Sequence, residues 1–242
     1  MMLVTRRFLL SLSILLVMFM AWKSVESADD IPEKMREELD RGKTQLEGEF
    51  KAAQEKLLSS FDKKISNSRS APKLSGEEKQ QLIANIEAEK ALFERLGHIP
   101  FTPVMRTDAI EYLNRVQKAE IALTKIYDRA IDSQTKQKKD EAARSLIEEK
   151  NQAIEPKRVA KWEFIPSPKP NIQSLWSNGS AGGKDRTHFW TLDHRHLVIK
   201  WKNKDAPGGF NIDTCVISAD GKHLDGKNNS DYKFTAKRIV TD

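Results

Sequence analysis

Residues 107–152 read TDAIEYLNRVQKAEIALTKIYDRAIDSQTKQKKDEAARSLIEEKNQ, and this stretch decides the fold expected of the chain. Its apolar residues recur at steps of mostly three and four, which is the spacing of one face of an α-helix. No Pro or Gly lies between Pro103 and Pro156, so nothing forces a break. We therefore predict a single helix over residues 107–152, with Thr107 as its N-cap and Asp108 in its first turn.

A helix of this length would extend for roughly 70 Å, which is more than one compact core covers. It therefore needs partners that pack along its apolar stripe. Residues 132–139 (DSQTKQKK) lack large apolar side chains. Three interpretations of this segment stay open: an exposed stretch, a kink, or the place where the helix loses its partner.

Two shorter helices are expected before the long one. Residues 28–68 keep one apolar stripe at helical spacing. A second helix starts at Ser75, which has its capping-box partner Glu78 three residues later, and ends at Gly97. This order predicts an elongated antiparallel helical hairpin or a three-helix, coiled-coil-like bundle over residues 28–155.

Residues 156–242 form the second predicted domain. Apolar and polar positions alternate there, and turn-forming segments separate the alternating runs. We predict strands near residues 162–165, 188–192, 196–202, 210–218 and 232–239, and a stiff connector with Pro166, Pro168 and Pro170. The expected fold class is α+β, with a signal segment, then the helices, then a small antiparallel β-sheet that forms a partial barrel.

The N-terminus has the pattern of a signal peptide over residues 1–27. Arg6 and Arg7 precede an apolar run over residues 8–22, and small residues precede Ala28. That run is shorter than the roughly 20 residues of a membrane-spanning helix. We expect cleavage before Ala28 and export to the periplasm or the extracellular space, with a retained N-terminal membrane anchor as the alternative.

Charge is divided unevenly between the two predicted domains. Residues 28–155 contain 23 Lys and Arg against 25 Asp and Glu, whereas residues 156–242 contain 15 against 9. A basic β domain suits an anionic glycan or lipid of the envelope, and a protein partner is also considered. Ordinary solubility charge is the simpler interpretation, because no run of five or six like charges occurs. An exported protein seldom meets nucleic acid, so no nucleic-acid partner is expected.

The single cysteine, Cys215, excludes an internal disulfide framework. We interpret Cys215 as a small buried apolar residue. An intermolecular disulfide is the alternative.

Two sequence patterns resemble a known family. The stretch EAEKALFERLGHIPFTPVMRTDAIEYLNRVQKAEIALTKIYDRAI, followed by DEAARSLIEEKNQ, resembles a helical module of uncharacterised, planctomycete-type exported bacterial proteins, over roughly residues 77–155. The C-terminal pattern W-x-L-D…H-L-V-I-K-W…D-A-P-G-G-F resembles their secreted β-sheet modules. The resemblance implies an exported protein built from these two modules, and it brings no catalytic residues.

Few residues suggest catalysis, so we predict no enzyme, no metal and no cofactor. His194 and His196 have a spacing that metal sites use, but no Cys-x-x-Cys or His-Glu-x-x-His motif accompanies them. A hydrolase that uses Asp193, Asp213 and His196 remains a second alternative, although most aspartates here lie in turn sequences.

Tryptophans and lysines of the β domain are the candidate ligand contacts. Trp162, Trp190 and Trp201 fall within strand patterns, which favours the core, and Trp176 is the one most expected to be exposed. The predicted ligand-binding residues are Trp176, Trp190, Trp201, Lys200 and Lys202. Tryptophans of this kind can serve as a platform for sugar rings or for a hydrophobic ligand.

We therefore expect a non-enzymatic exported envelope protein. Its helices would form a rod or an oligomerisation element, giving a possible homo-oligomer, and would present the basic β-sheet module. The first alternative is a lipocalin-like binder of a small lipid or glycan.

Overall fold

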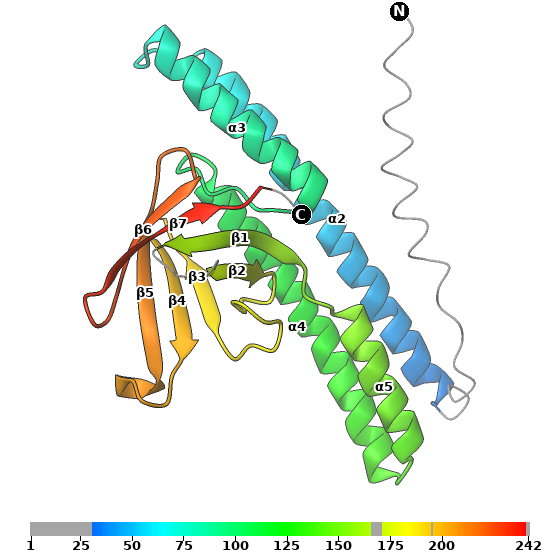
Figure 1. Cartoon of the computed structure of the whole chain (residues 1–242). Helices are drawn as coiled ribbons and strands as arrows, with labels where there is room; N and C mark the ends of the chain where they lie inside the picture. The colour runs from blue at the N-terminus through cyan, green and yellow to red at the C-terminus, as the bar shows by residue number, and fades with distance from the viewer. Residues whose placement is uncertain (1–30, 166–170, 195, 241–242) are drawn as a thin grey trace, which may run out of the picture.

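The computed structural model describes residues 31–165, 171–194 and 196–240 of the chain. Within this part the protein is α+β, with four helices followed by seven strands (Figure 1). The predicted signal peptide (residues 1–27) and the proline connector (residues 166–170) lie outside the described residues.

The first two helices, α2 (Glu33–Arg69) and α3 (Gly76–Leu96), form an antiparallel hairpin. Both predicted ends of α3 are confirmed. The Ser75 side chain accepts a hydrogen bond from the Glu78 N–H, and the Glu78 carboxylate accepts one from the Ser75 N–H. Gly97 ends the helix in the left-handed region, at φ 69°.

The single helix predicted over residues 107–152 is wrong. The chain forms α4 (Arg106–Lys136) and α5 (Asp140–Ala153), which run antiparallel. The reversal falls in the segment without large apolar residues, and Lys138 takes a φ of 59° there. Reversal lets Ala142 and Leu146 of α5 pack against the side of α4 instead of pointing into water.

The predicted N-cap at Thr107 is also wrong. The N-cap of α4 is Met105, and no side chain caps the helix by a hydrogen bond. Met105 and Arg106 are both buried, so packing against the β-sheet decides where this helix begins. Asp108 does lie in the first turn, as predicted.

The seven strands form one antiparallel sheet in the order β2-β1-β7-β6-β5-β4-β3. Their bounds are β1 (Arg158–Ile165), β2 (Asn171–Trp176), β3 (Phe189–Leu192), β4 (His196–Lys202), β5 (Phe210–Ile217), β6 (His223–Asn228) and β7 (Lys233–Arg238). Strands β2 and β6 were not predicted. The others overlap the predicted ranges, and β4 matches its range at both ends.

The sheet curls into a nearly closed barrel. Its edge strands β2 and β3 approach each other through isolated bridges that join Leu175 to Ala181 and Ser180 to Phe189. Backbone hydrogen bonds of Trp176 and Trp190 to residues 179–180 reinforce this seam. The predicted partial barrel is therefore confirmed at this coarse level.

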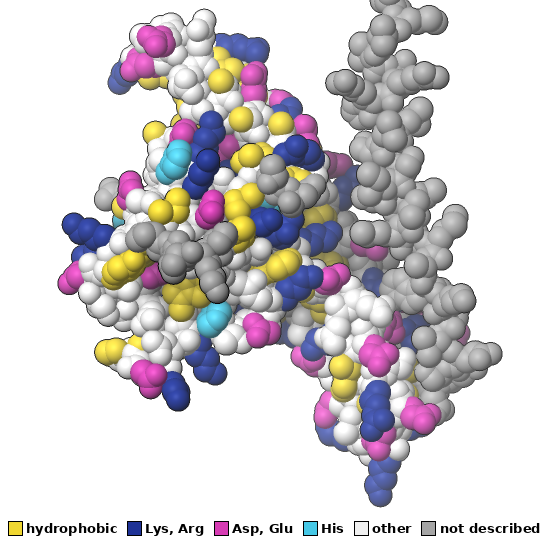
Figure 2. Space-filling model, in the orientation of Figure 1, with side chains coloured by type: hydrophobic (Ala, Val, Ile, Leu, Met, Phe, Trp, Pro, Cys, Tyr) yellow, Lys and Arg dark blue, Asp and Glu magenta, His cyan; other side chains and the backbone are white. Residues whose placement is uncertain are grey.

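Two clusters of buried side chains hold the molecule together. The larger joins the barrel to the helices, for example Trp162 and Leu197 with Phe61 and Phe101. The smaller lies between α2, α4 and α5 and contains Leu39, Tyr127 and Leu146, among others. Helix α4 contributes to both clusters, and charged side chains of both signs cover the outer surface of the helices (Figure 2).

Candidate functional site

The inside of the barrel serves largely as core. The buried inward-facing residues are Ala160, Trp162, Phe164, Leu175, Trp190, Leu197, Ile199, Cys215, Ile217, Leu224 and Ala236. They belong to the same cluster as Phe101 and Met105, which cover one end of the barrel. The position of Cys215 within this cluster, fully buried, supports its interpretation as a small core residue.

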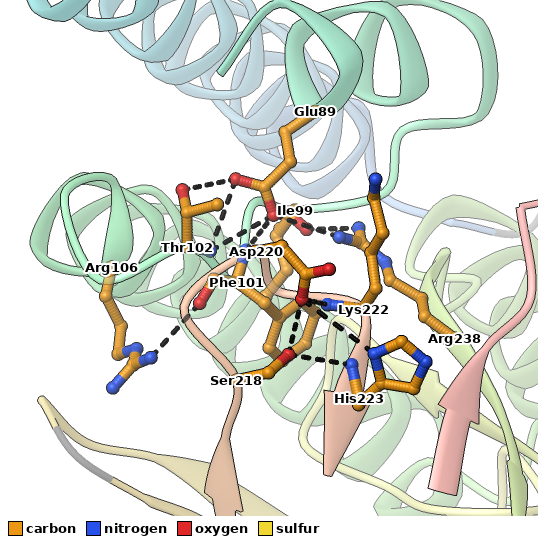
Figure 3. Close-up of polar contacts among 10 residues, drawn as sticks. All are labelled: Glu89, Ile99, Phe101, Thr102, Arg106, Ser218, Asp220, Lys222, His223 and Arg238. Carbon is orange, nitrogen blue, oxygen red and sulfur yellow. Dashed lines mark hydrogen bonds and ion pairs between the residues drawn. The ribbon is translucent and has the colours of Figure 1, made fainter. Parts of the chain in front are cut away.

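A buried ion pair fastens α3 to this covered end of the barrel (Figure 3). Arg238 Nη1 of β7 donates to Glu89 Oε1 of α3 at 3.0 Å, and only 1% and 4% of their side-chain surfaces are exposed. The Glu89 carboxylate also accepts hydrogen bonds from the backbone N–H groups of Phe101 and Thr102 and from the Thr102 hydroxyl. A buried carboxylate with this many donors is well compensated for its lost hydration.

Arg238 has further partners that fix its orientation. Its Nη2 donates to the carbonyl oxygen of Ile99 at 2.7 Å, and its guanidinium carbon lies 5.0 Å from the centroid of the Phe101 ring. Burial lowers the pKa of Arg238, while the charge of Glu89 opposes that shift. The pair therefore acts as a structural connection between helix and barrel.

The turn between β5 and β6 places Ser218, Asp220 and His223 close together in Figure 3, in a grouping that could be mistaken for a catalytic triad. The Ser218 hydroxyl donates to Asp220 Oδ1 at 2.6 Å, and the His223 backbone N–H donates to the hydroxyl oxygen. The His223 ring lies 3.9 Å from Asp220, and among the described residues it makes no hydrogen bond to the Ser218 hydroxyl. These contacts order a turn and do not activate Ser218 as a nucleophile.

A cleft of about 390 Å³ separates this turn from α3. Ala88, Leu92 and Arg95 of α3 line one side, and Lys222 and Val240 line the other. Arg95 donates to the carbonyl oxygen of Val240 at 2.7 Å, so part of its hydrogen-bonding capacity is already used. The other polar lining residues Asn85, Glu89, Asp220 and Arg238 are hydrogen-bonded as well, so most polar side chains of the cleft are already used.

The best candidate for a binding surface is a groove of about 480 Å³ on the outer face of β3, β4 and β5, which we call the outer groove. It is lined by Phe189, Trp190, Thr191, Val198, Lys200, Pro207, Gly208, Phe210 and Ile212. Lys200 is paired across the sheet with Phe189 and with Ile212, so these three side chains share the outer face. The rings of Phe189 and Phe210 lie 6.3 Å apart at one end of the groove.

Lysines border the apolar floor of the outer groove. Lys200 and Lys202 are exposed, and Lys202 is paired with Phe210 on the same face of the sheet. Lys227 of β6 is paired with Thr214, whose side chain also faces outward. Farther along this face, Val216 is 55% exposed, so apolar side chains and lysines alternate over several strands.

The five predicted ligand-binding residues do not form one site. Lys200 and Trp190 line the outer groove, although the Trp190 side chain is buried and its Nε1 donates to the carbonyl oxygen of Trp176. Lys202 lies beside the groove. Trp201 faces the inside of the barrel, where its Nε1 donates to Asp213 Oδ2 at 2.5 Å.

Trp176 lies at the seam of the barrel and does not line the outer groove, although its carbonyl oxygen accepts a hydrogen bond from Trp190. It is partly buried, its Nε1 donates to the carbonyl oxygen of Gly182, and Lys184 Nζ lies 4.9 Å from the centroid of its ring system. Seven residues of the groove were not predicted from the sequence: Phe189, Thr191, Val198, Pro207, Gly208, Phe210 and Ile212. The alternation of residues along β5 was visible in the sequence, but it did not show which face of the sheet is the outer one and therefore did not place Ile212 there.

Of the alternative catalytic residues, Asp193 and His196 lie together, with His196 Nδ1 3.6 Å from Asp193 Oδ2, but Asp213 is separate from them. Asp193 orders the turn before β4 by accepting the His196 backbone N–H at 2.6 Å, whereas Asp213 lies inside the barrel with Trp201. Within the described part of the chain, no three His, Cys, Asp or Glu side chains are grouped so that they could hold a metal ion.

Comparisons with known proteins give no match, either to a protein-family model, to a curated protein or to a solved structure. None of the helices in residues 31–165, 171–194 and 196–240 has the combined length and hydrophobicity needed to cross a membrane. What points to a function is therefore the surface of the molecule, above all the outer groove.

Proposed function

We propose that the protein is a non-enzymatic, exported envelope protein that binds anionic lipid surfaces through the outer groove. The observation that carries the proposal is the groove itself, with an apolar floor of Phe189, Phe210 and Ile212 bordered by Lys200 and Lys202. Apolar side chains surrounded by lysines fit the boundary between acyl chains and anionic head groups.

The charge distribution supports the same partner. Residues 156–242 carry a net charge of +6, counted as 15 basic minus 9 acidic residues, and the groove lies within them. Each lysine near an anionic membrane contributes about 1 kcal/mol, and this contribution is screened by salt. The signal pattern at the N-terminus is consistent with a protein that meets such a surface.

The helices act in this proposal as a brace and as a surface for association. The long α2 packs along α4, and ion pairs such as Arg115–Glu49 and Lys56–Glu111 bridge the two. Ile121 of α4 is 54% exposed and Ile147 of α5 is 44% exposed, which leaves apolar side chains for a homo-oligomer. Light scattering on the chain from Ala28 onward measures whether this association occurs.

The lipid proposal is tested by cosedimentation of the chain from Ala28 onward with vesicles. Vesicles that contain phosphatidylglycerol are compared with vesicles of phosphatidylcholine alone, at low and at high salt. We expect salt-sensitive binding that depends on phosphatidylglycerol. The double variant Lys200→Glu/Lys202→Glu should weaken it at least about tenfold, because each reversal replaces an attraction with a repulsion.

A matched control is the double variant Lys233→Glu/Lys237→Glu, which makes the same charge change at exposed positions on β7. Retained binding by this control, together with loss by the groove variant, supports the groove as the contact. Equal losses in both variants would mean that net charge alone attracts the protein. Equal binding to both kinds of vesicle would refute the proposal.

A further inference from the structure

Two lysines of β4 give the outer groove a cationic end. Lys200 and Lys202 face outward from this strand and are exposed. Neither forms an ion pair or a side-chain hydrogen bond among the described residues. Lys204 and Asp205 in the following loop carry opposite charges and leave this balance unchanged. One end of the groove therefore has positive charge that an anionic ligand could neutralise.

Apolar side chains continue from the two lysines along the same face of the sheet. Phe189 on β3 and Phe210 on β5 lie on either side of β4 at the lysine end, with ring centroids 6.3 Å apart. Successive rows farther from Lys202 contain Ile212, then Val198, and then Val216, which is 55% exposed. The surface thus has a direction, from a cationic end toward an apolar end.

The length of this surface matches one acyl chain. From Lys202 to His196, whose partner on β5 is Val216, strand β4 extends for roughly 20 Å at about 3.3 Å per residue. A single acyl chain covers half of the hydrocarbon core of a bilayer, which is roughly 15 Å. The groove volume of about 480 Å³ lies within the range of small-molecule sites, roughly 300–1,000 Å³. One chain therefore fits along β4 with a head group at the lysine end.

The inside of the barrel, by contrast, is occupied by side chains of the protein itself. Leu197 and Ile199 of β4 and Cys215 of β5 are fully buried there, within the larger core cluster. An acyl chain on that side would have to displace part of a packed core, which lowers stability. The outer face of the β4–β5 pair is therefore the side on which a chain can bind.

We propose that the outer groove binds one single-chain anionic amphiphile, such as a lysophospholipid, with its phosphate at Lys200 and Lys202 and its acyl chain along β4 toward Val216. This inference rests on the proposed lipid-binding function, because it assigns a ligand to the same groove. It differs in the form of the lipid, which is a monomer held by one protein instead of the surface of a bilayer. A single groove can cover the one chain of a lysophospholipid, whereas the second chain of a phospholipid would remain in water.

The test is a calorimetric titration of the chain from Ala28 onward with lauroyl lysophosphatidylglycerol, below its critical micelle concentration. We expect saturable binding of one amphiphile per protein. Monolauroylglycerol has the same chain and lacks the phosphate, so it should bind at least about tenfold more weakly, because the charge-assisted hydrogen bonds to lysine are lost. Myristoyl lysophosphatidylglycerol has two more methylenes and should bind about threefold to tenfold more tightly.

Two variants locate the head group and the chain separately. Lys202→Ala should weaken binding of lauroyl lysophosphatidylglycerol at least about threefold and leave binding of monolauroylglycerol unchanged. Ile212→Thr keeps a β-branched side chain and should weaken binding of both amphiphiles by about threefold or more. The matched controls are Lys233→Ala, at an exposed position on β7, and Ile172→Thr, at a position on β2 that is 45% exposed. Both controls lie outside the groove and should bind as the unchanged chain does.

Equal binding of the two lauroyl amphiphiles, no saturable binding below the micelle concentration, or equal losses in Ile212→Thr and Ile172→Thr would each overturn the inference. The comparison of the two amphiphiles needs no variant, so it remains decisive if a variant folds poorly.

Vesicle experiments separate this inference from the proposed function. Binding to vesicles that depends on phosphatidylglycerol, without saturable binding of the monomer, would show that the groove contacts a bilayer. That result would overturn the inference and leave the proposed function intact. Saturable binding of the monomer without vesicle binding would support the inference and overturn the proposal of a lipid surface as the partner.

Discussion

The buried pair of Glu89 and Arg238 gives the sharpest prediction about stability. Replacing Glu89 with Ala leaves the Arg238 guanidinium buried, with the carbonyl oxygen of Ile99 as its one remaining hydrogen-bond partner among the described residues. It also removes the acceptor for the backbone N–H groups of Phe101 and Thr102. Removing one partner of a buried ion pair costs about 3–5 kcal/mol, and we expect a loss of this size in the free energy of unfolding.

Urea-induced unfolding, followed by tryptophan fluorescence and circular dichroism, measures this loss. A typical domain has only about 5–15 kcal/mol of stability, so the midpoint of the transition should fall clearly. Glu87→Ala is the matched control, because Glu87 is exposed on the same helix, and it should change stability by about 0.5 kcal/mol or less. A loss below about 1 kcal/mol for Glu89→Ala would refute the view that this pair fastens α3 to the barrel.

A double variant separates the charge from the packing. Glu89→Leu/Arg238→Met removes both charges and fills the space with apolar side chains. We expect it to recover most of the stability that Glu89→Ala loses, because replacing a whole buried ion pair by well-packed apolar residues is often neutral. A loss as large as that of Glu89→Ala would assign the effect to the hydrogen bonds of the 101–102 backbone instead.

Further predictions concern four single positions. Gly221→Ala should lower the free energy of unfolding in urea by about 2 kcal/mol or more, because Gly221 has a φ of +70° and an added Cβ would lie 2.8 Å from Glu89 Oε1. Gly48 lies at an open position inside α2, so Gly48→Ala should instead raise the free energy of unfolding by about 0.5–1 kcal/mol. Burial raises the pKa of Cys215 to about 12, so its reaction with a thiol reagent should be on the order of a hundredfold slower in the folded protein than in urea. The raised pKa of Asp213 means that the folded state holds the proton of this carboxyl group more tightly than the unfolded chain does. Stability should therefore fall as the pH rises from about 4 through the raised pKa, and Asp213→Asn should remove this pH dependence. Rapid labelling of native Cys215 would contradict the prediction for the thiol. Identical pH profiles of stability for Asp213→Asn and the unchanged chain would contradict the prediction for Asp213.

The sequence was most informative where the physical signal is local. The capping box of Ser75 and Glu78 and the left-handed Gly97 define α3, since each acts through bonds within a few residues. Strand β4 was equally clear, because its apolar residues alternate without interruption. In both cases local preference and tertiary packing agree.

The reversal between α4 and α5 could not be read from helical periodicity. Two antiparallel helices and one continuous helix can show the same apolar spacing, and neither Gly nor Pro marks the turn at Lys138. Strand β6 was missed for a related reason, since Leu224 is its only buried residue and it therefore shows no alternation. What defines both elements is contact with distant parts of the chain.

The candidate sites were harder to predict than the fold. Trp190, Trp201, Lys200 and Lys202 were identified as candidate residues, but the sequence did not show which of them share a face. Cross-strand register places Lys200 outside with Ile212 and places Trp201 inside near Asp213. Register depends on the pairing of strands, so a binding surface made from several strands becomes visible only once that pairing is known.

The position of Arg238 has a consequence for how the polypeptide is made. It lies on β7, the strand that pairs with β1, and its partner Glu89 is 149 residues away. A nascent chain therefore cannot complete the connection between α3 and the barrel until β7 has been synthesised. Until that moment the sheet lacks the strand that lies between β1 and β6, so the barrel is completed only after all four helices have been synthesised.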